Sequence, residues 1–319
     1  MRLIALLLVL ASQAMAADVV RVNTFPNAKA LPFYAGVEKG IFAKHGLDVR
    51  VAFTENSEKQ RAGLAAGTFD IAHSAVDNAV AMVEDAKQDV VIVTGGDNGM
   101  NAFYAQPHIR KLADLRGQTL VVDAPNTAYA VLAKKMLLKE GLQEGRDYTV
   151  KPVGRGELRL KAMIDSRDNT AAILNLPFTI QAEQIGLRSF GNPVEIVGPY
   201  QAGGAFMLRS WARKNGALLE RYIAAFVEAL RWSLAPANRE ESVALLMSRL
   251  KLSNDIADRT LRALADPSRG FTPDAAFDMQ GFRNLLALRA EIEGGKPGAP
   301  EKYVDLSYYE RALKRVKQP

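Results

Sequence analysis

Short runs rich in β-branched residues alternate with segments of helical periodicity along most of the chain. The first series predicts strands at 19–23, 47–53, 69–73 and 90–94, separated by helices. Pro32 opens the first helix, because the fixed φ of proline suits a first turn, and Gly46 ends it. Ser57 and Gln60 have the spacing of a capping box at the start of the next helix.

A glycine-rich stretch at 95–99 interrupts this rhythm, which then resumes. The second series predicts strands at 119–123, 148–153 and 170–174, and two more at 194–197 and 205–208. From Ser210 onward the pattern is helical. Strands that alternate with helices are typical of parallel sheets covered on both faces. Two such series followed by a helical tail predict two α/β lobes, each built on a mostly parallel sheet.

The first sixteen residues form a separate unit. Arg2 precedes an apolar run at 3–11, and Ala14-Met15-Ala16 places small residues where signal peptidase cleaves. This pattern predicts a secretory signal peptide cut after Ala16. The alternative is a membrane anchor, but the apolar run is well short of the roughly 20 residues that span a bilayer. We therefore expect an exported, soluble, periplasmic protein without a lipid anchor.

Composition narrows the function further. Of 319 residues, 48% are apolar and 24% charged, which is the ordinary globular balance. The formal charge is +6, but basic residues mostly alternate with acidic ones, so we expect no nucleic-acid partner. Cysteine is absent and only three histidines occur, which excludes thiolate metal sites and cysteine nucleophiles and argues against a multi-histidine cage. We expect neither a metal nor a cofactor.

Four motifs carry a resemblance to a known family. They read KGIFAKHGLDV at 39–49, LAAGTFDIA at 64–72, DLRG at 114–117 before the strand TLVVD, and Pro177 with a glycine nine residues later. In this order, behind an export signal, they resemble the nitrate/sulfonate/taurine-type substrate-binding proteins of ABC transporters. That superfamily also contains binders of thiamine-precursor pyrimidines and of riboflavin. The resemblance covers nearly all of residues 19–250.

The resemblance implies a two-lobed periplasmic-binding-protein fold of type II, in which the chain crosses twice between lobes. We expect lobe 1 to comprise 17–100 and 195–319, including the helical C-terminal tail, and lobe 2 to comprise 101–194. The implied function is that of the solute-binding component of an ABC importer. A monomer would capture a small polar, heteroaromatic or anionic organic ligand by hinge closure and deliver it to a membrane permease. The stretch 166–170 departs from the family pattern, which leaves the ligand class open.

Candidate ligand-binding residues follow from position in the fold. In open α/β sheets, ligands lie outside the carboxyl ends of strands, where helix N-termini offer free N–H groups. Four loops meet this condition, at 24–27, 73–78, 124–129 and 175–178, and Gly154-Arg155-Gly156 stands nearby. Each side chain also has a competing structural role as turn, cap or core. The candidates are Phe25, Asn27, Ser74, Asp77, Asn98, Asn126, Thr127, Arg155, Asn175 and Phe178.

Two other functions remain open at this point. A periplasmic receptor for a sensor kinase would have the same fold. An enzyme resembling thiamine-pyrimidine synthases would need a lysine that holds pyridoxal phosphate, a nearby histidine and a cysteine-rich iron motif, and the chain has no cysteine. Neither a G-x-S-x-G nor an H-E-x-x-H motif occurs. We therefore expect no catalytic residues.

Overall fold

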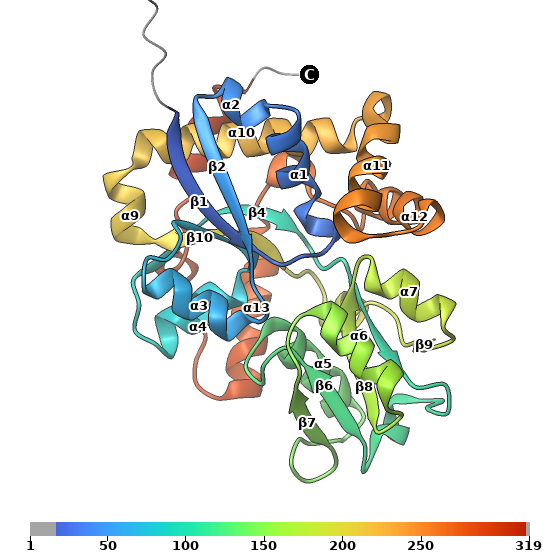
Figure 1. Ribbon diagram of the computed structural model, residues 1–319. Helices are drawn as coiled ribbons and strands as arrows, with labels where there is room; N and C mark the ends of the chain where they lie inside the picture. Colours follow the sequence, from blue (N-terminus) through green and yellow to red (C-terminus); the bar gives the residue numbers. More distant parts are fainter. Residues whose placement is uncertain (1–16, 317–319) are drawn as a thin grey trace, which may run out of the picture.

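The computed structural model describes residues 17–316 and shows an α/β fold with two mixed β-sheets, between which the chain crosses twice (Figure 1). Residues 1–16, which include the expected signal peptide, lie outside the described residues. Within the described part of the chain, no helix is long and apolar enough to span a membrane.

Sheet A has the strand order β2-β1-β3-β10-β4. Strands β1, β2 and β3 are parallel, and β10 is antiparallel to both of its neighbours, β3 and β4. Sheet A therefore brings the strand that follows the second crossing between strands of the first series. Its strands are β1 (Asp18–Thr24), β2 (Leu47–Phe53), β3 (Ile71–Ala75), β4 (Val90–Asp97) and β10 (Gly203–Leu208).

Sheet B repeats this plan with the order β7-β6-β8-β5-β9. Strands β6, β7 and β8 are parallel, and β5 is antiparallel to β8. In each sheet an interior strand, β10 or β5, runs antiparallel to its neighbours, and this strand is the first one after a crossing. The strands of sheet B are β5 (Asn101–Ala105), β6 (Thr119–Val122), β7 (Thr149–Pro152), β8 (Asn169–Asn175) and β9 (Arg188–Ser189).

Helices cover both faces of both sheets (Figure 1). The first part of the chain adds η1 (Ala28–Ala30), α1 (Leu31–Glu38), α2 (Ile41–Lys44), α3 (Ser57–Ala65), α4 (Asp77–Glu84), η2 (Leu112–Leu115), α5 (Ala128–Lys139), α6 (Gly156–Asp165), α7 (Phe178–Gln184) and α8 (Val194–Val197). The C-terminal part adds α9 (Arg209–Lys214), α10 (Gly216–Leu234), η3 (Pro236–Asn238), α11 (Arg239–Leu250), α12 (Asn254–Leu264), η4 (Pro273–Ala275), α13 (Met279–Glu293), η5 (Pro300–Lys302) and α14 (Ser307–Leu313).

The predicted strands of the first series are confirmed to within three residues at their ends, but three local predictions are wrong and the strands β5 and β9 are not predicted. Gly40 adopts φ 65°, which divides the expected single helix into α1 and α2. Asn56, not Ser57, caps α3 by accepting a hydrogen bond from the Lys59 amide. The run 194–197 is the short helix α8, because Pro193 starts a turn and no neighbouring strand is in place.

Sheet B shows why alternation along a strand matters. Leu120 and Val122 of β6 face α5, whereas Val121 between them packs toward α6 and α7. Successive side chains of a strand point to opposite faces, so a continuous apolar run marks a strand buried on both sides. Helices therefore cover both faces of this sheet, and the carboxyl ends of its parallel strands point toward sheet A.

One hydrophobic cluster continues from sheet A into sheet B. It joins Val90 and Ile92 of β4 with Phe282 and Leu286 of α13, and it extends to Met136 of α5. Helix α13 therefore packs on α5 and shares this cluster with β4 of sheet A (Figure 1). The two sheets are connected by the crossings and also by this apolar contact.

A buried histidine stands at the centre of the other core cluster. The ring of His73, on β3, lies 4.6 Å from that of Phe226 and 4.9 Å from that of Phe33. Its Nε2 shares a 2.9 Å hydrogen bond with the hydroxyl of Tyr222. Burial lowers the pKa of His73 from 6.5 to about 3, so the ring is neutral at physiological pH.

This histidine makes the fold sensitive to acid. The unfolded chain binds a proton near pH 6.5, whereas the folded chain resists it until about pH 3. Stability is therefore fully present above pH 6.5 and falls as the pH drops toward 3, by about 1.4 kcal/mol per pH unit from this residue. We expect His73→Gln to remove that part of the slope in denaturant titrations between pH 7 and 5. The exposed His108→Gln is the control, and an unchanged slope in His73→Gln contradicts the assignment.

Candidate ligand-binding site

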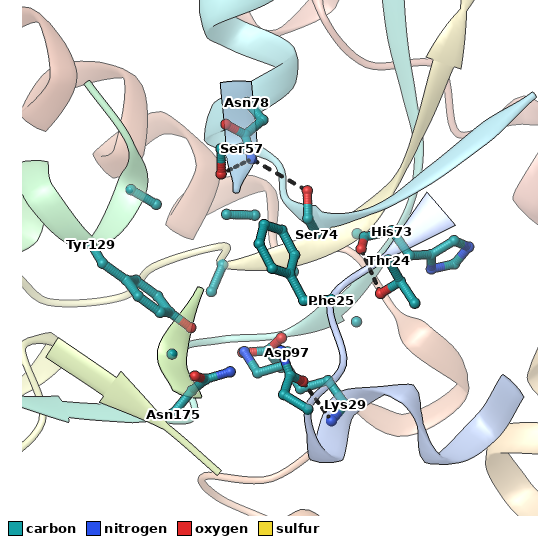
Figure 2. Close-up of a pocket in the computed structure, with 18 of the residues that line it drawn as sticks. Thr24, Phe25, Lys29, Ser57, His73, Ser74, Asn78, Asp97, Tyr129 and Asn175 are labelled. Carbon is teal, nitrogen blue, oxygen red and sulfur yellow. Dashed lines mark hydrogen bonds and ion pairs between the residues drawn. The ribbon is translucent and has the colours of Figure 1, made fainter. Parts of the chain in front are cut away.

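A cavity lies where the carboxyl ends of the parallel strands of both sheets face each other, beside the crossings (Figure 2). Its volume is about 110 Å³. For comparison, a cavity of about 150 Å³ accommodates benzene. The cavity in this arrangement of the two sheets is therefore somewhat smaller than a cavity that holds one benzene ring. Residues of β1, β3, β4, β8 and β10 line it, with Asp123 directly after β6 and residues of η1, α1, α3, α4, α5, α6 and α10.

Asp97 forms the floor of the cavity and holds the first crossing. Its Oδ1 accepts hydrogen bonds from the amides of Gly99 and Met100, at 3.0 and 3.1 Å. Its backbone carbonyl accepts from the amide of Ala202 in the second crossing, at 3.0 Å. A Cβ on Gly203 would overlap Asp97 Oδ2, which explains glycine there. One residue thus connects both chain crossings.

Lys29 completes the floor by an ion pair with Asp97, 2.7 Å from Nζ to Oδ1 (Figure 2). Burial alone would lower the pKa of Lys29, but the Asp97 carboxylate, with the Tyr129 phenol, outweighs it and holds that pKa above the ordinary value. The amine is therefore a fixed cation. Because Lys29 belongs to η1 and Tyr129 to α5, the two halves meet at this ammonium group.

The sheet A side carries a closed polar network. Ser74 donates to Gln60 Oε1 at 2.6 Å, and Asn78 Nδ2 donates to the hydroxyls of Ser57 and Ser74 (Figure 2). Thr24 donates to the carbonyl of His73 at 2.9 Å. These groups satisfy one another and form a rigid wall, since paired polar side chains lose their freedom to reorient.

Aromatic residues form the apolar part of the cavity. Phe25 enters from the loop after β1, and Phe33, His73 and Phe226 stand behind it as one cluster. Tyr129 lies opposite, on α5 (Figure 2). Aromatic faces on both sides favour a flat ligand, because they gain contact area at little entropic cost.

The sheet B side carries two buried charges of opposite sign. Arg159 on α6 is only 3% exposed, donates to the carbonyls of Gly154 and Ile173, and lies 5.6 Å from the Tyr129 ring centroid. Asp123, at the end of β6, is 7% exposed. Burial lowers the pKa of the Arg159 guanidinium, and nearby Asp123 opposes the shift.

Two helix N-termini also face the cavity from this side. Neither Thr127 at the start of α5 nor Arg155 at the start of α6 caps its helix through the side chain. The first N–H groups of each helix have no acceptor within the helix, and the helix dipole places partial positive charge there. Asn175 lies between them at the end of β8, with Oδ1 against Gly156.

Hydrogen bonds close the cavity across the two halves. The amide of Ser57 donates to Asp123 Oδ2 at 3.0 Å, and the amide of Arg155 donates to the carbonyl of Glu55 at 2.8 Å. The amide of Ala28 donates to the carbonyl of Leu176 at 3.2 Å. These contacts place the two sheets in a closed arrangement around the cavity.

Asn126 is held by two arginines from the other half. Arg61 on α3 donates to its side-chain oxygen at 3.1 Å, and Arg289 on α13 donates to its carbonyl at 3.2 Å. Arg289 also pairs with Asp77 and Asp85, each at 2.9 Å. Burial raises the pKa of Asp77, and the ion pair with Arg289 opposes that effect. This cluster fastens the halves beside the cavity.

Six of the ten candidate residues line the cavity, and they come from both sheets. They are Phe25, Asn27, Ser74, Thr127, Arg155 and Asn175. Arg155 directs its guanidinium to Glu157, an exposed carboxylate, rather than into the cavity centre. Asn27 accepts from the Lys29 amide as the cap of η1.

The other four candidates lie elsewhere in the structure. Asp77 is buried against Arg289, and Asn126 joins the same cluster. Phe178 packs in the core between sheet B and its helices. Asn98 is exposed in the first crossing. None of the four lines the cavity.

Sequence reasoning missed every charged residue of the cavity except Arg155. Asp123 follows β6 directly, so the strand-end argument alone was enough to find it. Arg159 lies one turn into α6 and Lys29 five residues past β1, and neither position differs in the sequence from an ordinary solvated cation. Asp97 was assigned to the glycine-rich break, whereas Gly95, Gly96 and Asp97 still belong to β4.

Among the described residues, no group of three or more histidine or acidic side chains is arranged to hold a metal ion. The cavity instead offers hydrogen-bond donors, acceptors and aromatic faces.

The fold is similar to that of several solved proteins. A protein of Bordetella bronchiseptica RB50 superposes with a TM-score of 0.81 at 20% identity, over 94% of this chain and 98% of its own. The periplasmic nitrate-binding protein NrtA from Synechocystis PCC 6803 gives 0.76 at 14% identity, over 95% and 90%. The alkanesulfonate-binding protein SsuA from Xanthomonas axonopodis pv. citri, bound to MOPS, gives 0.73 at 16% identity, over 92% and 99%.

The same fold also occurs in an enzyme. The desulfurization enzyme DszB superposes with a TM-score of 0.63 at 14% identity, over 93% of this chain and 99% of its own. Identities this low establish the two-lobed fold and leave the activity to the chemistry of the site.

Comparison with curated protein sequences gives no significant match. A family model does match, over residues 14–247, which is well over half of the chain. The matched segment contains every strand of both sheets and all the described residues that line the cavity except Phe271. The chain therefore belongs to the NMT1-like family.

Proposed function

We propose that this protein is the periplasmic solute-binding component of an ABC importer. The observation that carries the proposal is the cavity between the two sheets, which side chains from both sheets line with hydrogen-bonding groups and aromatic rings. Such sites at the carboxyl ends of strands are where open α/β folds bind ligands. The binding functions of the nitrate- and alkanesulfonate-binding proteins with the same fold support it.

Ligand capture would proceed by hinge closure at the crossings. We propose 17–100 and 195–319 as lobe 1 and 101–194 as lobe 2, with the hinge at Asp97–Asn101 and 199–203. The Asp97 contacts would remain in both states, whereas the contacts of Asp123 with Ser57 and of Asn126 with Arg61 cross the cleft and would form on closure. Closed protein would then present a surface made of both lobes to the membrane permease.

Catalysis by an amine nucleophile is disfavoured by the geometry. Lys29, the lysine of the cavity, is paired with Asp97 and its pKa lies above the ordinary value, whereas a nucleophilic or imine-forming lysine must lose its proton. His73 is bonded to Tyr222 in the core. The polar groups of the cavity are placed to hold a ligand.

A ligand screen tests the proposal directly. Residues 17–319 are unfolded and refolded to strip carried-over ligand, then heated with sulfonates, nitrate, aromatic carboxylates, pyrimidines, flavins or amino-acid derivatives. A ligand at about 100 times its Kd adds about 2.7 kcal/mol, so the melting temperature rises by a few degrees. The compound should be recovered unchanged, and its chemical conversion would contradict the proposal.

The matched variants place that binding in the cavity. Tyr129→Leu removes the ring and the phenol beside Lys29, and we expect it to weaken binding about tenfold or more. Phe53→Leu likewise replaces an aromatic ring by leucine, at a side chain that is 45% exposed and outside the cavity, and this variant should bind as the wild type does. Equal effects of the two variants would move the site elsewhere.

Asn126 provides a test of closure. Asn126→Ala loses the hydrogen bond from Arg61 without touching the cavity, so the closed state is destabilised and the apparent affinity falls by about tenfold. Small-angle scattering of the ligand-free variant should show a larger radius of gyration than the wild type. The exposed Asn254→Ala serves as control. A normal affinity with a normal radius would exclude this contact from closure.

A further inference from the structure

The polar side chains of the cavity are paired to different degrees on its two sides. On the lobe 1 side the side chains of Thr24, Ser74 and Asn78 have protein partners, and Asp97 pairs with Lys29 through Oδ1, while its Oδ2 lies against Gly203 without a hydrogen bond among the described residues. On the lobe 2 side three side chains keep unpaired polar atoms among the described residues. These are Asp123, Arg159 and Asn175.

Asp123 provides the clearest unpaired atom. Its Oδ2 accepts the amide of Ser57 from lobe 1, at 3.0 Å. Its Oδ1 is buried and has no hydrogen-bond partner among residues 17–316. A buried carboxylate oxygen without a donor is unfavourable, so a group that donates an N–H or O–H would stabilise it.

Arg159 has an unpaired donor, whereas Asp123 has an unpaired acceptor. Its Nε and Nη1 donate to backbone carbonyls, whereas Nη2 has no acceptor within the described chain. The guanidinium is 3% exposed and forms no ion pair with a described carboxylate, although it senses the charge of Asp123. It therefore lacks an acceptor that a ligand can supply.

Asn175 offers the cavity both a hydrogen-bond donor and an acceptor. It is 4% exposed, lines the cavity and has no side-chain hydrogen bond among the described residues. Its amide donates and accepts, so it satisfies either part of a ligand. Asn175 is the last residue of β8, and Asp123 directly follows the neighbouring strand β6. Because Arg159 lies on α6, which packs on both strands, the three side chains line the same region of the cavity.

Resting on the proposed solute-binding function, we propose that lobe 2 selects the ligand. Asp123 would accept a hydrogen bond from the ligand, and Arg159 would donate one to it. The ligand group that fits both is uncharged and has a hydrogen-bond donor beside an acceptor. A primary carboxamide, a lactam or a urea is such a group. Lobe 1 supplies the aromatic wall around Phe25 and the floor, where Lys29 is already paired with Asp97.

The charges of the site set this selectivity. A carboxylate satisfies Arg159 but brings a second negative charge toward the unpaired oxygen of Asp123. An amidinium satisfies Asp123 but brings a second cation toward Arg159. Like charges in a buried site repel strongly, and each ion leaves one protein group without a partner.

The role of Asp123 also links recognition to closure. One oxygen faces the ligand and the other holds the N-terminus of α3 from lobe 1. A ligand donor on Oδ1 would keep the carboxylate oriented for Ser57. Loss of the ligand donor would leave a rotating carboxylate and a weaker contact between the lobes.

Three probes with the same ring test the selectivity. Benzamide presents a donor beside an acceptor, benzoate only acceptors, and benzamidine only donors. Calorimetry on the full chain 17–319 should give benzamide an affinity at least tenfold higher than either ion. In Asp123→Asn, which can also donate, the preference for benzamide over benzoate should fall about tenfold.

The control and the outcomes separate this proposal from the broader one. Asp147→Asn makes the same change at a buried lobe 2 carboxylate that pairs with Arg116 and Arg146 outside the cavity, and the preference should be unchanged. Benzoate or benzamidine binding as well as benzamide, or the same preference in Asp123→Asn, overturns the selectivity while solute binding stands. Binding of none of the three also overturns it, and the ligand screen then decides the proposed function alone.

Discussion

The carboxylate of Asp97 is the contact on which the arrangement of the two sheets depends. It accepts hydrogen bonds from the two amides that precede β5 and pairs with Lys29 at the floor of the cavity. The backbone carbonyl of Asp97 accepts from the segment that leads into β10. Both crossings, and therefore both sheets, are positioned relative to one buried residue. The cavity lies beside that residue, where the carboxyl ends of the parallel strands of the two sheets face each other.

A second connection restricts how the halves move. Helix α13 packs on α5 and on the core of sheet A in one hydrophobic cluster, and Arg289 on this helix contacts Asp77, Asp85 and Asn126. Apolar contacts of this kind are retained when packed helices slide by small steps. If the cavity opens as proposed, bending at the crossings would have to be accompanied by sliding of α13 on α5, and that packing would limit the amplitude.

The sequence alone was sufficient for most of the architecture, because periodicity and glycine positions are local signals. It failed where a tertiary partner decides: the run 194–197 has the residues of a strand but no neighbouring strand, and β5 is recognisable only once β8 lies beside it. At the site, strand ends identified Asn175 and Ser74. Lys29 and Arg159 escaped because their burial is created by residues distant in sequence, which no local pattern encodes.

The crowding of Gly203 against Asp97 has a consequence for the diversification of this family. Any side chain at that glycine displaces the carboxylate that holds both crossings, so the floor of the cavity admits few substitutions. The walls are under no such restriction, since Phe25 and Tyr129 stand on loops and helix ends whose side chains hold no crossing in place. New ligand preferences would therefore be expected to arise by changes in the walls, with the floor inherited unchanged between paralogues.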